Sequence, residues 1–250
     1  MKVFISSLKY LSAVLFWLVL WHVASVAISN SIILVSPINT FLRLFELATQ
    51  GHFWQTISFS LTRIVLGFAM SLIIGVIAAS ITSRSKILYT LALPAFNTIK
   101  AVPVASFTIL ALMWIDSSNL SVFIAFVTVL PIVYFNTYEG IKNTDAKLLE
   151  MSKVFAVSVP KVMLGVYFPS VLPYVISAAA SGLGFAFKAG VAAELIGLAR
   201  NTIGFNLHTA RVFLQTADML AWTIAIVPLS YIMEKIFLLC LKRVEKWQSS

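Results

Sequence analysis

The feature that most constrains this chain is a series of apolar runs, each about 20 residues long and nearly free of charge, such as the run from Tyr10 to Ile28. In hydrocarbon, every backbone N–H and C=O group needs a partner within the protein, so only helices or closed barrels cross a membrane. Barrel strands alternate apolar and polar residues over about ten positions. A helix of about 20 apolar residues, in contrast, spans the bilayer core. The pattern predicts an all-α integral membrane protein.

The composition leads to the same conclusion. Hydrophobic residues make up 60% of the chain and charged residues only 11%. Ordinary soluble domains are about 45–50% apolar and about 25% charged. Lipid must therefore be the solvent for most of the surface.

About six transmembrane helices are expected from the apolar runs. Their approximate bounds are Tyr10–Ile28, Thr56–Ile81, Ile87–Trp114, Leu120–Tyr138, Phe168–Val191 and Met219–Leu241. The third run is interrupted by Pro94, Lys100 and Pro103. The first run, preceded by lysines and ending in small residues, is also typical of a cleaved signal peptide. We expect it to be a retained helix, because it is long enough to span.

The basic residues are distributed unevenly between the two sides of the predicted bundle. With the N-terminus inside, 12 of the 18 Lys and Arg residues fall on one side and only Arg43, Arg200 and Arg211 on the other. Cytoplasmic loops carry such an excess. The sequence thus predicts an inner-membrane protein with both termini in the cytoplasm. The net charge of +9 then reflects topology, so no nucleic-acid partner is expected.

A short amphipathic segment is expected between the first two spans. Ser36 and Pro37 form a helix-start signal. Phe41, Leu44, Phe45 and Ala48 then follow at helical spacing on one face. This segment is predicted to lie along the outer interface.

The longest inner loop, Glu139–Lys161, is predicted to form a short helix-turn-helix. Leu148, Met151 and Phe155 are spaced i, i+3, i+7 and place an apolar stripe on one face. Ser158 is expected to cap a second short helix that has Pro160 in its first turn. Such an element suits docking into a groove on a soluble partner.

This loop resembles the signature of binding-protein-dependent ABC importer permeases, which begins Glu-Ala-Ala, continues with a Gly and ends Ile-x-Leu-Pro. The matching residues, at the same spacing, are Glu150, Met151, Ser152, Ala156, Val166, Phe168 and Pro169. Ala156 stands where the signature has Gly. Ala enters the left-handed conformation only at a cost, so the local turn is a point to check.

Further runs resemble one branch of that family, the permeases for sulfonates, taurine, nitrate and related small molecules. These runs are Lys100-Ala101-Val102-Pro103, Gly140-Ile141-Lys142-Asn143, Leu172-Pro173, Ala193-Glu194-Leu195-Ile196-Gly197 and Ala210-Arg211. Importer permeases for thiamine precursors resemble the same branch, so that substrate class stays open.

The resemblance implies a type I ABC importer permease fold, with residues 1–250 as one permease domain. It also implies an assembly of two permease copies, two ABC ATPases and an extracytoplasmic substrate-binding protein. The ATPases would dock on the coupling loop at about 139–167, which includes Glu139 and Gly140. They would use ATP and Mg²⁺. This chain lacks a phosphate-binding Gly-x4-Gly-Lys-Ser/Thr loop and is expected to carry no cofactor and to be no enzyme.

Several ionisable residues within or beside the spans are candidates for the translocation pathway. They are Arg63, Lys100 and Lys188, since charged groups in a membrane usually face a bundle interior or a water-filled path. The alternative is snorkelling to the interface or pairing with a carboxylate. Pro103 marks either a moving or a static kink. Glu194 is placed at the start of an outer loop, where it either contacts the binding protein or pairs with Arg200.

The sequence argues against two other functional classes. A membrane enzyme is disfavoured because the sequence shows no paired carboxylates, metal-ligand cluster or nucleophile–base pair. A proton-driven secondary transporter would bury carboxylates in its spans. Here all nine acids are placed at span ends, in loops or close to them, which argues against that class.

Overall fold

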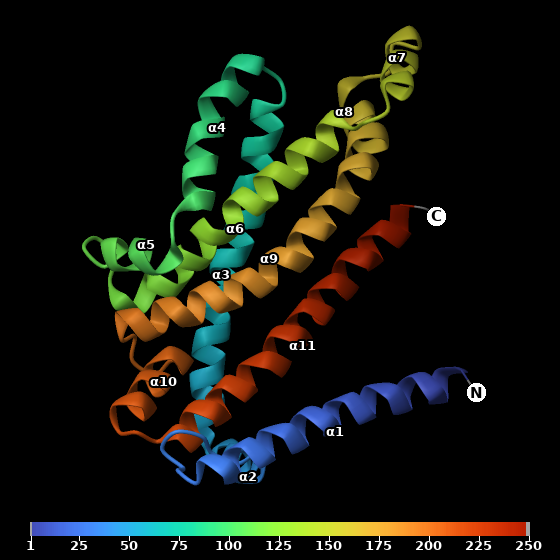
Figure 1. Cartoon of the computed structure of the whole chain (residues 1–250). Coiled ribbons are helices and arrows are strands. Elements are labelled where there is room, and N and C mark those ends of the chain that lie inside the picture. Colours follow the sequence, from blue (N-terminus) through green and yellow to red (C-terminus); the bar gives the residue numbers. More distant parts are fainter. Residues whose placement is uncertain (1, 249–250) are drawn as a thin grey trace.

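The structure is a computed structural model that describes residues 2–248 and the side chains of residues 12–239. The described residues form helices joined by short turns (Figure 1). The elements are α1 (Lys2–Ile28), α2 (Pro37–Ala48), α3 (Gly51–Thr82), α4 (Lys86–Ala101), α5 (Val104–Ala111), α6 (Ser117–Lys142), α7 (Ala146–Val154), α8 (Val159–Val162), the π-turn η1 (Met163–Tyr167), α9 (Phe168–Gly197), α10 (Ile203–Val212) and α11 (Thr216–Gln248). The predicted all-α fold class is confirmed.

Within residues 12–239, whose side chains the structure describes, four helical segments are long and apolar enough to cross a membrane. They are Gly51–Thr82, Ser117–Lys142, Val159–Gly197 and Thr216–Leu239. These confirm the second, fourth, fifth and sixth predicted spans. The first is present as α1, and the apolar part within the described side chains, Ser12–Ile28, is shorter than the others.

The third predicted span is not one straight helix. α4 and α5 together are long and apolar enough to span the membrane, but they meet at an angle of 100°. The break falls at Val102 and Pro103, which both have extended backbone dihedrals. Proline disfavours the helical conformation of the residue before it, and its ring removes a backbone donor. Pro94, in contrast, lies inside α4 without ending it.

The core of the bundle lies where α3, α6, α9 and α11 meet. Ile64, Phe68, Val129, Leu183 and Trp222 are among its buried residues. α3 and α6 approach each other closely, and the Ser71 hydroxyl of α3 donates a 2.7 Å hydrogen bond to the Phe126 carbonyl of α6. Small residues permit this proximity in membrane helices.

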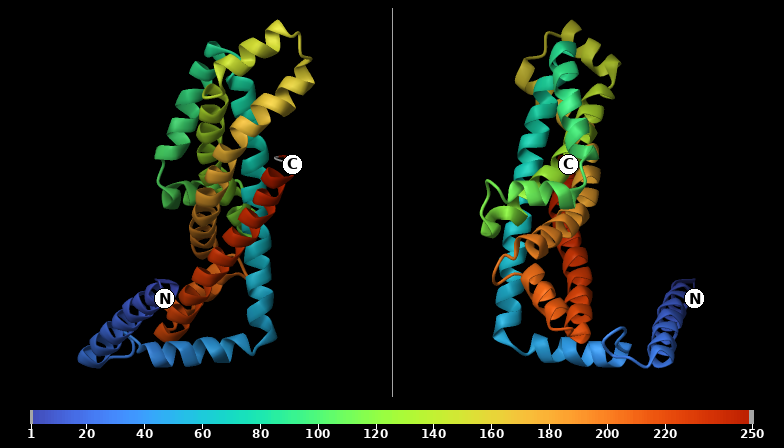
Figure 2. Two further views of the ribbon diagram at one scale, coloured as in Figure 1. Left: turned by 90° about the vertical axis from the view of Figure 1, so that its right-hand side faces the viewer. Right: turned by 60° about the vertical axis from the view of Figure 1, so that its left-hand side comes forward.

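The small residues of α9 allow close helix packing. An added Cβ at Gly182 would lie 2.9 Å from Val129, and one at Gly190 would lie 2.6 Å from Ile64. Ala178 is fully buried. α9 therefore lies close to both α6 and α3, as the figures also show (Figures 1 and 2).

The two ends of the bundle differ. α7 lies at one end, and α2 and α10 lie at the other, with α2 running crosswise to α3 (Figure 2). Ser36 caps α2, accepting a hydrogen bond from the Asn39 N–H, as predicted. Leu44 and Ala48 of the predicted apolar face pack on the core, whereas Phe41 and Phe45 stay exposed.

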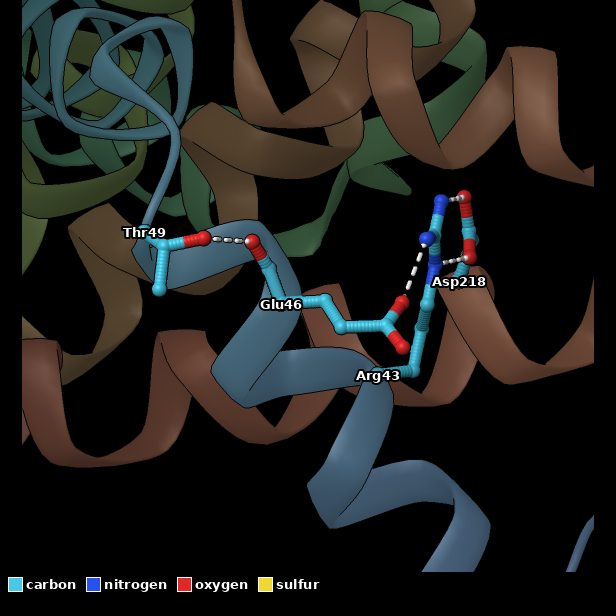
Figure 3. A network of polar contacts seen from close by, with 4 residues as sticks. All are labelled: Arg43, Glu46, Thr49 and Asp218. Atoms are coloured by element: carbon cyan, nitrogen blue, oxygen red, sulfur yellow. Dashed lines mark hydrogen bonds and ion pairs between the residues drawn. The ribbon is translucent and has the colours of Figure 1, made fainter.

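An ion pair fastens α2 to the start of α11. The Arg43 guanidinium donates two hydrogen bonds to the Asp218 carboxylate and a third, of 2.8 Å, to Glu46 (Figure 3). The hydrogen bonds to Asp218 and then Glu46 raise the pKa of Arg43 above its usual value, so this charge is permanent. A two-point contact of this kind fixes orientation as well as distance.

α1 diverges from the rest of the bundle (Figures 1 and 2). It is joined to the segment before α2 by hydrogen bonds from the Trp21 indole to the Val35 carbonyl and from Ser25 to the Leu34 carbonyl. Its apolar residues are largely exposed, including Phe16 and Trp17 at 61% and 65%. Lipid or another membrane helix is the surrounding that such a surface requires.

Candidate functional site

The α7–α8 loop has the predicted helix-turn-helix form. Asp145 caps α7, since its carboxylate accepts a hydrogen bond from the Lys147 N–H. α8 begins after Ser158 and holds Pro160 in its first turn, although the Ser158 side chain makes no capping hydrogen bond. Capping residues and proline at these positions are local signals, which explains why the sequence sufficed here.

The turn after α7 settles the question raised by Ala156. This residue has a φ of 48°, in the left-handed region. The Val157 N–H bonds to the Ser152 carbonyl at 2.9 Å, and the Ala156 N–H to the Lys153 carbonyl at 3.1 Å. These two bonds define a Schellman motif, in which Gly is the usual residue. Ala156 thus adopts the turn that the family's glycine favours, at a cost of about 1 kcal/mol.

The loop presents apolar side chains to its surroundings. Leu148, Met151 and Phe155 of the predicted stripe are 41%, 54% and 73% exposed, and Val154 is 80% exposed. Glu150 is exposed beside them. A cluster of exposed apolar residues rimmed by charge marks a surface for a partner.

The other residues predicted for the coupling loop lie on its flanking helices. Glu139 and Gly140 belong to the last turn of α6. Gly140 is buried, and a Cβ there would lie 2.9 Å from the Tyr174 ring, so this position allows α6 to approach α9. Val166 lies in η1, and Phe168 and Pro169 begin α9.

Lys100, one of the two lysines predicted for the pathway, lines a cavity between α4, α5, α6 and α9. Its volume is about 540 Å³, and its lining includes Lys100, Thr98, Thr128, Ser181 and Phe185. No acidic residue is in the lining.

Lys188 is not one of the lining residues. Its ammonium nevertheless lies 5.8 Å from the centre of the ring of Phe185, which is a lining residue. The Lys100 ammonium lies 5.8 Å from the Phe135 ring. Cation–π contacts of this kind hold an ammonium without neutralising it. Lys100 therefore supplies a cation to the cavity lining, and Lys188 is linked to the lining only through its contact with Phe185. Pro103, the break between α4 and α5, immediately precedes the lining residue Val104.

Glu194 is the main correction to the sequence-based expectations. It lies within the last turn of α9 rather than in a loop, and it is fully buried. Its Oε2 accepts hydrogen bonds of 2.8 Å from the Ser60 hydroxyl and 3.2 Å from the Gly204 N–H. Among the described side chains, its hydrogen-bond partners are thus Ser60 and Gly204 rather than Arg200. Glu194 lies at the end of its span, as expected for the acids, but the sequence did not predict that its carboxylate is buried.

Glu194 is part of a buried polar cluster that joins α3, α9 and α10. The Ser60 hydroxyl, besides donating to Glu194, accepts a 2.9 Å hydrogen bond from the Ile203 N–H. Arg63 Nη1, Ser121 Oγ and Glu194 Oε1 are buried without a hydrogen-bond partner. The Arg63 side chain is half-buried beside this cluster. It does not line the cavity that contains Lys100. A serine on one helix and a glycine about 140 residues later carry no common local signal, so the sequence alone could not reveal the cluster.

An all-helical bundle of membrane-length helices, with a basic cavity among them and an exposed helical loop beyond them, defines a membrane transport permease. The chain belongs to the family of binding-protein-dependent transport system inner membrane components, whose sequence model matches residues 71–246. It is the permease subunit of an ABC importer, as the signature loop predicted. This membership decides against the proton-driven secondary transporter and identifies a transport component rather than an enzyme.

Two relatives and one solved structure define the similarity further. An aliphatic sulfonates transport permease protein (SsuC) of Bacillus subtilis is 26% identical over 234 residues, covering 92% of this chain and 84% of the relative. A bicarbonate transport system permease protein (CmpB) of Synechococcus elongatus is 26% identical over 213 residues, covering 80% and 76%. The crystal structure of an amino acid ABC transporter with histidines matches with a TM-score of 0.60 at 15% identity, over 82% of this chain and 96% of that chain. The relatives confirm the predicted branch of the family, and the solved structure confirms the fold.

Proposed function

We propose that this permease passes a small organic or inorganic anion, of the sulfonate, taurine or nitrate kind. The observation that carries the proposal is the cavity at Lys100, with Lys188 beside it and no acid in its lining. Relatives named for sulfonates and bicarbonate, both anions at neutral pH, support it. Thr98, Thr128 and Ser181 supply hydroxyl donors in the same lining.

The depth of Lys100 fits a place within the membrane. It lies 14 residues after Lys86, the first residue of α4. At 1.5 Å per residue this is about 21 Å along the helix. The hydrocarbon core is about 30 Å thick. Snorkelling from such a depth is costly for a lysine, whereas a water-filled path accommodates its charge.

The α7 end of the bundle is proposed to face the cytoplasm and to dock an ABC ATPase. Basic residues gather there, and they include Arg84, Lys86, Lys142, Lys147 and Lys153. The exposed apolar side chains of α7 supply the contact. Two copies of this chain, two ATPases using ATP and Mg²⁺, and an extracytoplasmic binding protein at the α10 end would complete the importer.

In this mechanism the energy source lies outside the chain. Closure of the ATPases on ATP moves the α7–α8 loop as a rigid body, and α6 and α9, which flank the loop, carry the motion into the spans. The binding protein releases the anion into the outward-open cavity at Lys100. Hydrolysis then restores the inward-open arrangement. An alternation of two packed states is the usual way such a shift is transmitted.

Replacing Lys100 with Met tests the anion path. The variant removes one cation and keeps the length of the side chain, so we expect assembly with the ATPase to persist and uptake of the anion to fall at least several-fold. Lys86→Met is the matched control, because Lys86 is exposed at the start of α4 and outside the cavity lining. Uptake unchanged in Lys100→Met, or uptake of a thiamine precursor in place of an anion, would refute the proposal.

A further inference from the structure

A second, larger cavity lies at the α7 end of the bundle, away from the two lysines of the proposed anion path. Its volume is about 770 Å³. It is enclosed by the ends of α3 and α6 on one side and by α7, α8, η1 and the start of α9 on the other. It therefore separates the spans from the loop proposed to dock the ATPase.

The walls of this cavity are apolar and its polar edge is basic. Val76, Ile141, Leu149 and Leu164 belong to the walls. Arg84 and Lys142 are the charged residues in the lining, and no acidic residue is among them. Among the described side chains, neither forms an ion pair, although Lys142 donates a 3.0 Å hydrogen bond to the Ser83 carbonyl.

The cavity is also deep enough to hold the headgroup of a lipid and the upper part of an acyl chain. Val76 lies six residues before Thr82, the last residue of α3, about 9 Å along the helix at 1.5 Å per residue, and Arg84 follows in the turn after α3. The basic groups thus lie at the level where α3 and α6 end, and the apolar wall continues about two turns into the span. The π-turn Met163–Tyr167 contributes Met163, Leu164 and Tyr167 to the wall, and π-turns are frequent at functional sites.

We propose that this cavity binds one anionic phospholipid, with its phosphate at Arg84 and Lys142 and the upper part of an acyl chain against the apolar wall. The proposal rests on the cytoplasmic orientation of the α7 end given above. A small soluble anion would make no use of the apolar wall. Basic pockets between membrane helices on the cytoplasmic side recognise anionic headgroups. Val154 and Phe155, the most exposed apolar residues of α7, are outside the lining, so ATPase docking and lipid binding use separate surfaces.

A lipid in this position would touch both sides of the joint through which the ATPase moves the spans. The lining joins α3 and α6 to Leu149 of α7 and Val159 of α8. Filling the space makes the loop and the spans move together, whereas an unfilled space lets the loop shift against them. Coupling between ATP hydrolysis and uptake then depends on anionic lipid.

The test measures the lipid retained by the assembled importer after reconstitution in nanodiscs that mix phosphatidylglycerol with phosphatidylcholine. Native mass spectrometry of the released complex counts each lipid. We expect wild type to retain phosphatidylglycerol in preference to phosphatidylcholine. The pair Arg84→Gln and Lys142→Gln should reduce the preference about 25-fold, since each basic residue contributes about fivefold.

The matched control removes the same number of charges from the same end of the bundle. Lys86→Gln with Lys147→Gln does so outside the cavity lining and should leave the preference unchanged. Ala146→Phe, which adds a ring to the lining without altering charge, should reduce retention of both lipids. The proposal would be overturned if both double variants lost the lipid preference equally or if wild type showed no preference. It would also be overturned if inorganic phosphate displaced phosphatidylglycerol.

Lipid retention is measured without transport, so its outcome is independent of the anion path. A negative result leaves the Lys100 experiment untouched, and failure of the Lys100 experiment leaves lipid retention untouched. If the lipid binds, proteoliposomes made from the same two lipids should show continued ATP hydrolysis but less anion uptake as phosphatidylglycerol is withdrawn.

Discussion

Replacing Glu194 with Ala tests whether the buried cluster fastens α10 to the bundle. The change leaves the Ser60 hydroxyl and the Gly204 N–H without their acceptor in a buried site. Each such group costs about 1–3 kcal/mol, so the two together cost about 2–6 kcal/mol. The change also removes Oε1, a buried oxygen without a hydrogen-bond partner, and with it the desolvation cost of that atom, which offsets part of the loss. We therefore expect a destabilisation near the lower end, about 2–3 kcal/mol.

Glu194→Gln separates hydrogen bonding from charge. Its side-chain carbonyl oxygen keeps an acceptor for both donors, so less than half of the loss seen with Ala is expected. Thermal unfolding of the purified permease in detergent, followed by tryptophan fluorescence, measures both variants, because Trp222 lies in the core beside these helices. Glu150→Ala, at an exposed position, is the control and should unfold with wild type.

The result that refutes this reasoning is an equal loss in the Ala and Gln variants. It would mean that the charge of Glu194, rather than its hydrogen bonds to Ser60 and Gly204, stabilises the cluster. Wild-type stability in the Ala variant would mean that α10 is held by apolar contacts alone.

Three further predictions concern packing and the proposed coupling loop. Ala156→Gly should stabilise the loop by about 1 kcal/mol, because glycine adopts the left-handed conformation of this residue without strain. Ala156→Val should destabilise the loop, since a β-branched residue is strained in this conformation. Both effects are measured as changes in melting temperature, and a Val variant as stable as wild type would contradict the Schellman assignment. Gly67→Ala places a Cβ 2.2 Å from the Val122 carbonyl oxygen and should lower the free energy of unfolding by at least about 1–3 kcal/mol in the same assay. Gly184→Ala is the control and should be neutral, because no atom lies within 4 Å of the added carbon. Equal effects of the two variants would contradict the close α3–α6 contact. Phe155→Asp should abolish co-purification of the ATPase. The melting temperature of the permease should stay unchanged, because Phe155 is 73% exposed. Retained co-purification would show that α7 is not part of the docking surface.

The membrane spans and the loop were predictable because their signals are local. Hydropathy over about 20 residues located α3, α6, α9 and α11, and the spacing of Glu150, Ala156 and Pro169 located the signature loop. Even the departure at Ala156 identified the one position of the loop where the backbone is left-handed. The sequence predicted that Pro94, Lys100 and Pro103 interrupt the third run, but not that the chain turns by 100° between α4 and α5 while Pro94 and Lys100 stay within α4.

The cavities and the polar cluster required the tertiary structure, because each depends on which faces of distant helices meet. Lys100 and Lys188 were recognised separately as expensive charges, and only the packing of α4 and α6 against α9 shows that Lys100 lines a cavity to which Lys188 is linked through Phe185. Glu194 was assigned to a loop because its neighbours in sequence suggest a helix end, whereas its partners are Ser60 on α3 and Gly204 on α10. Hydropathy and spacing measure free energies of transfer and of local backbone conformation, and neither contains the contact between helices that decides whether a charge is buried, paired or free.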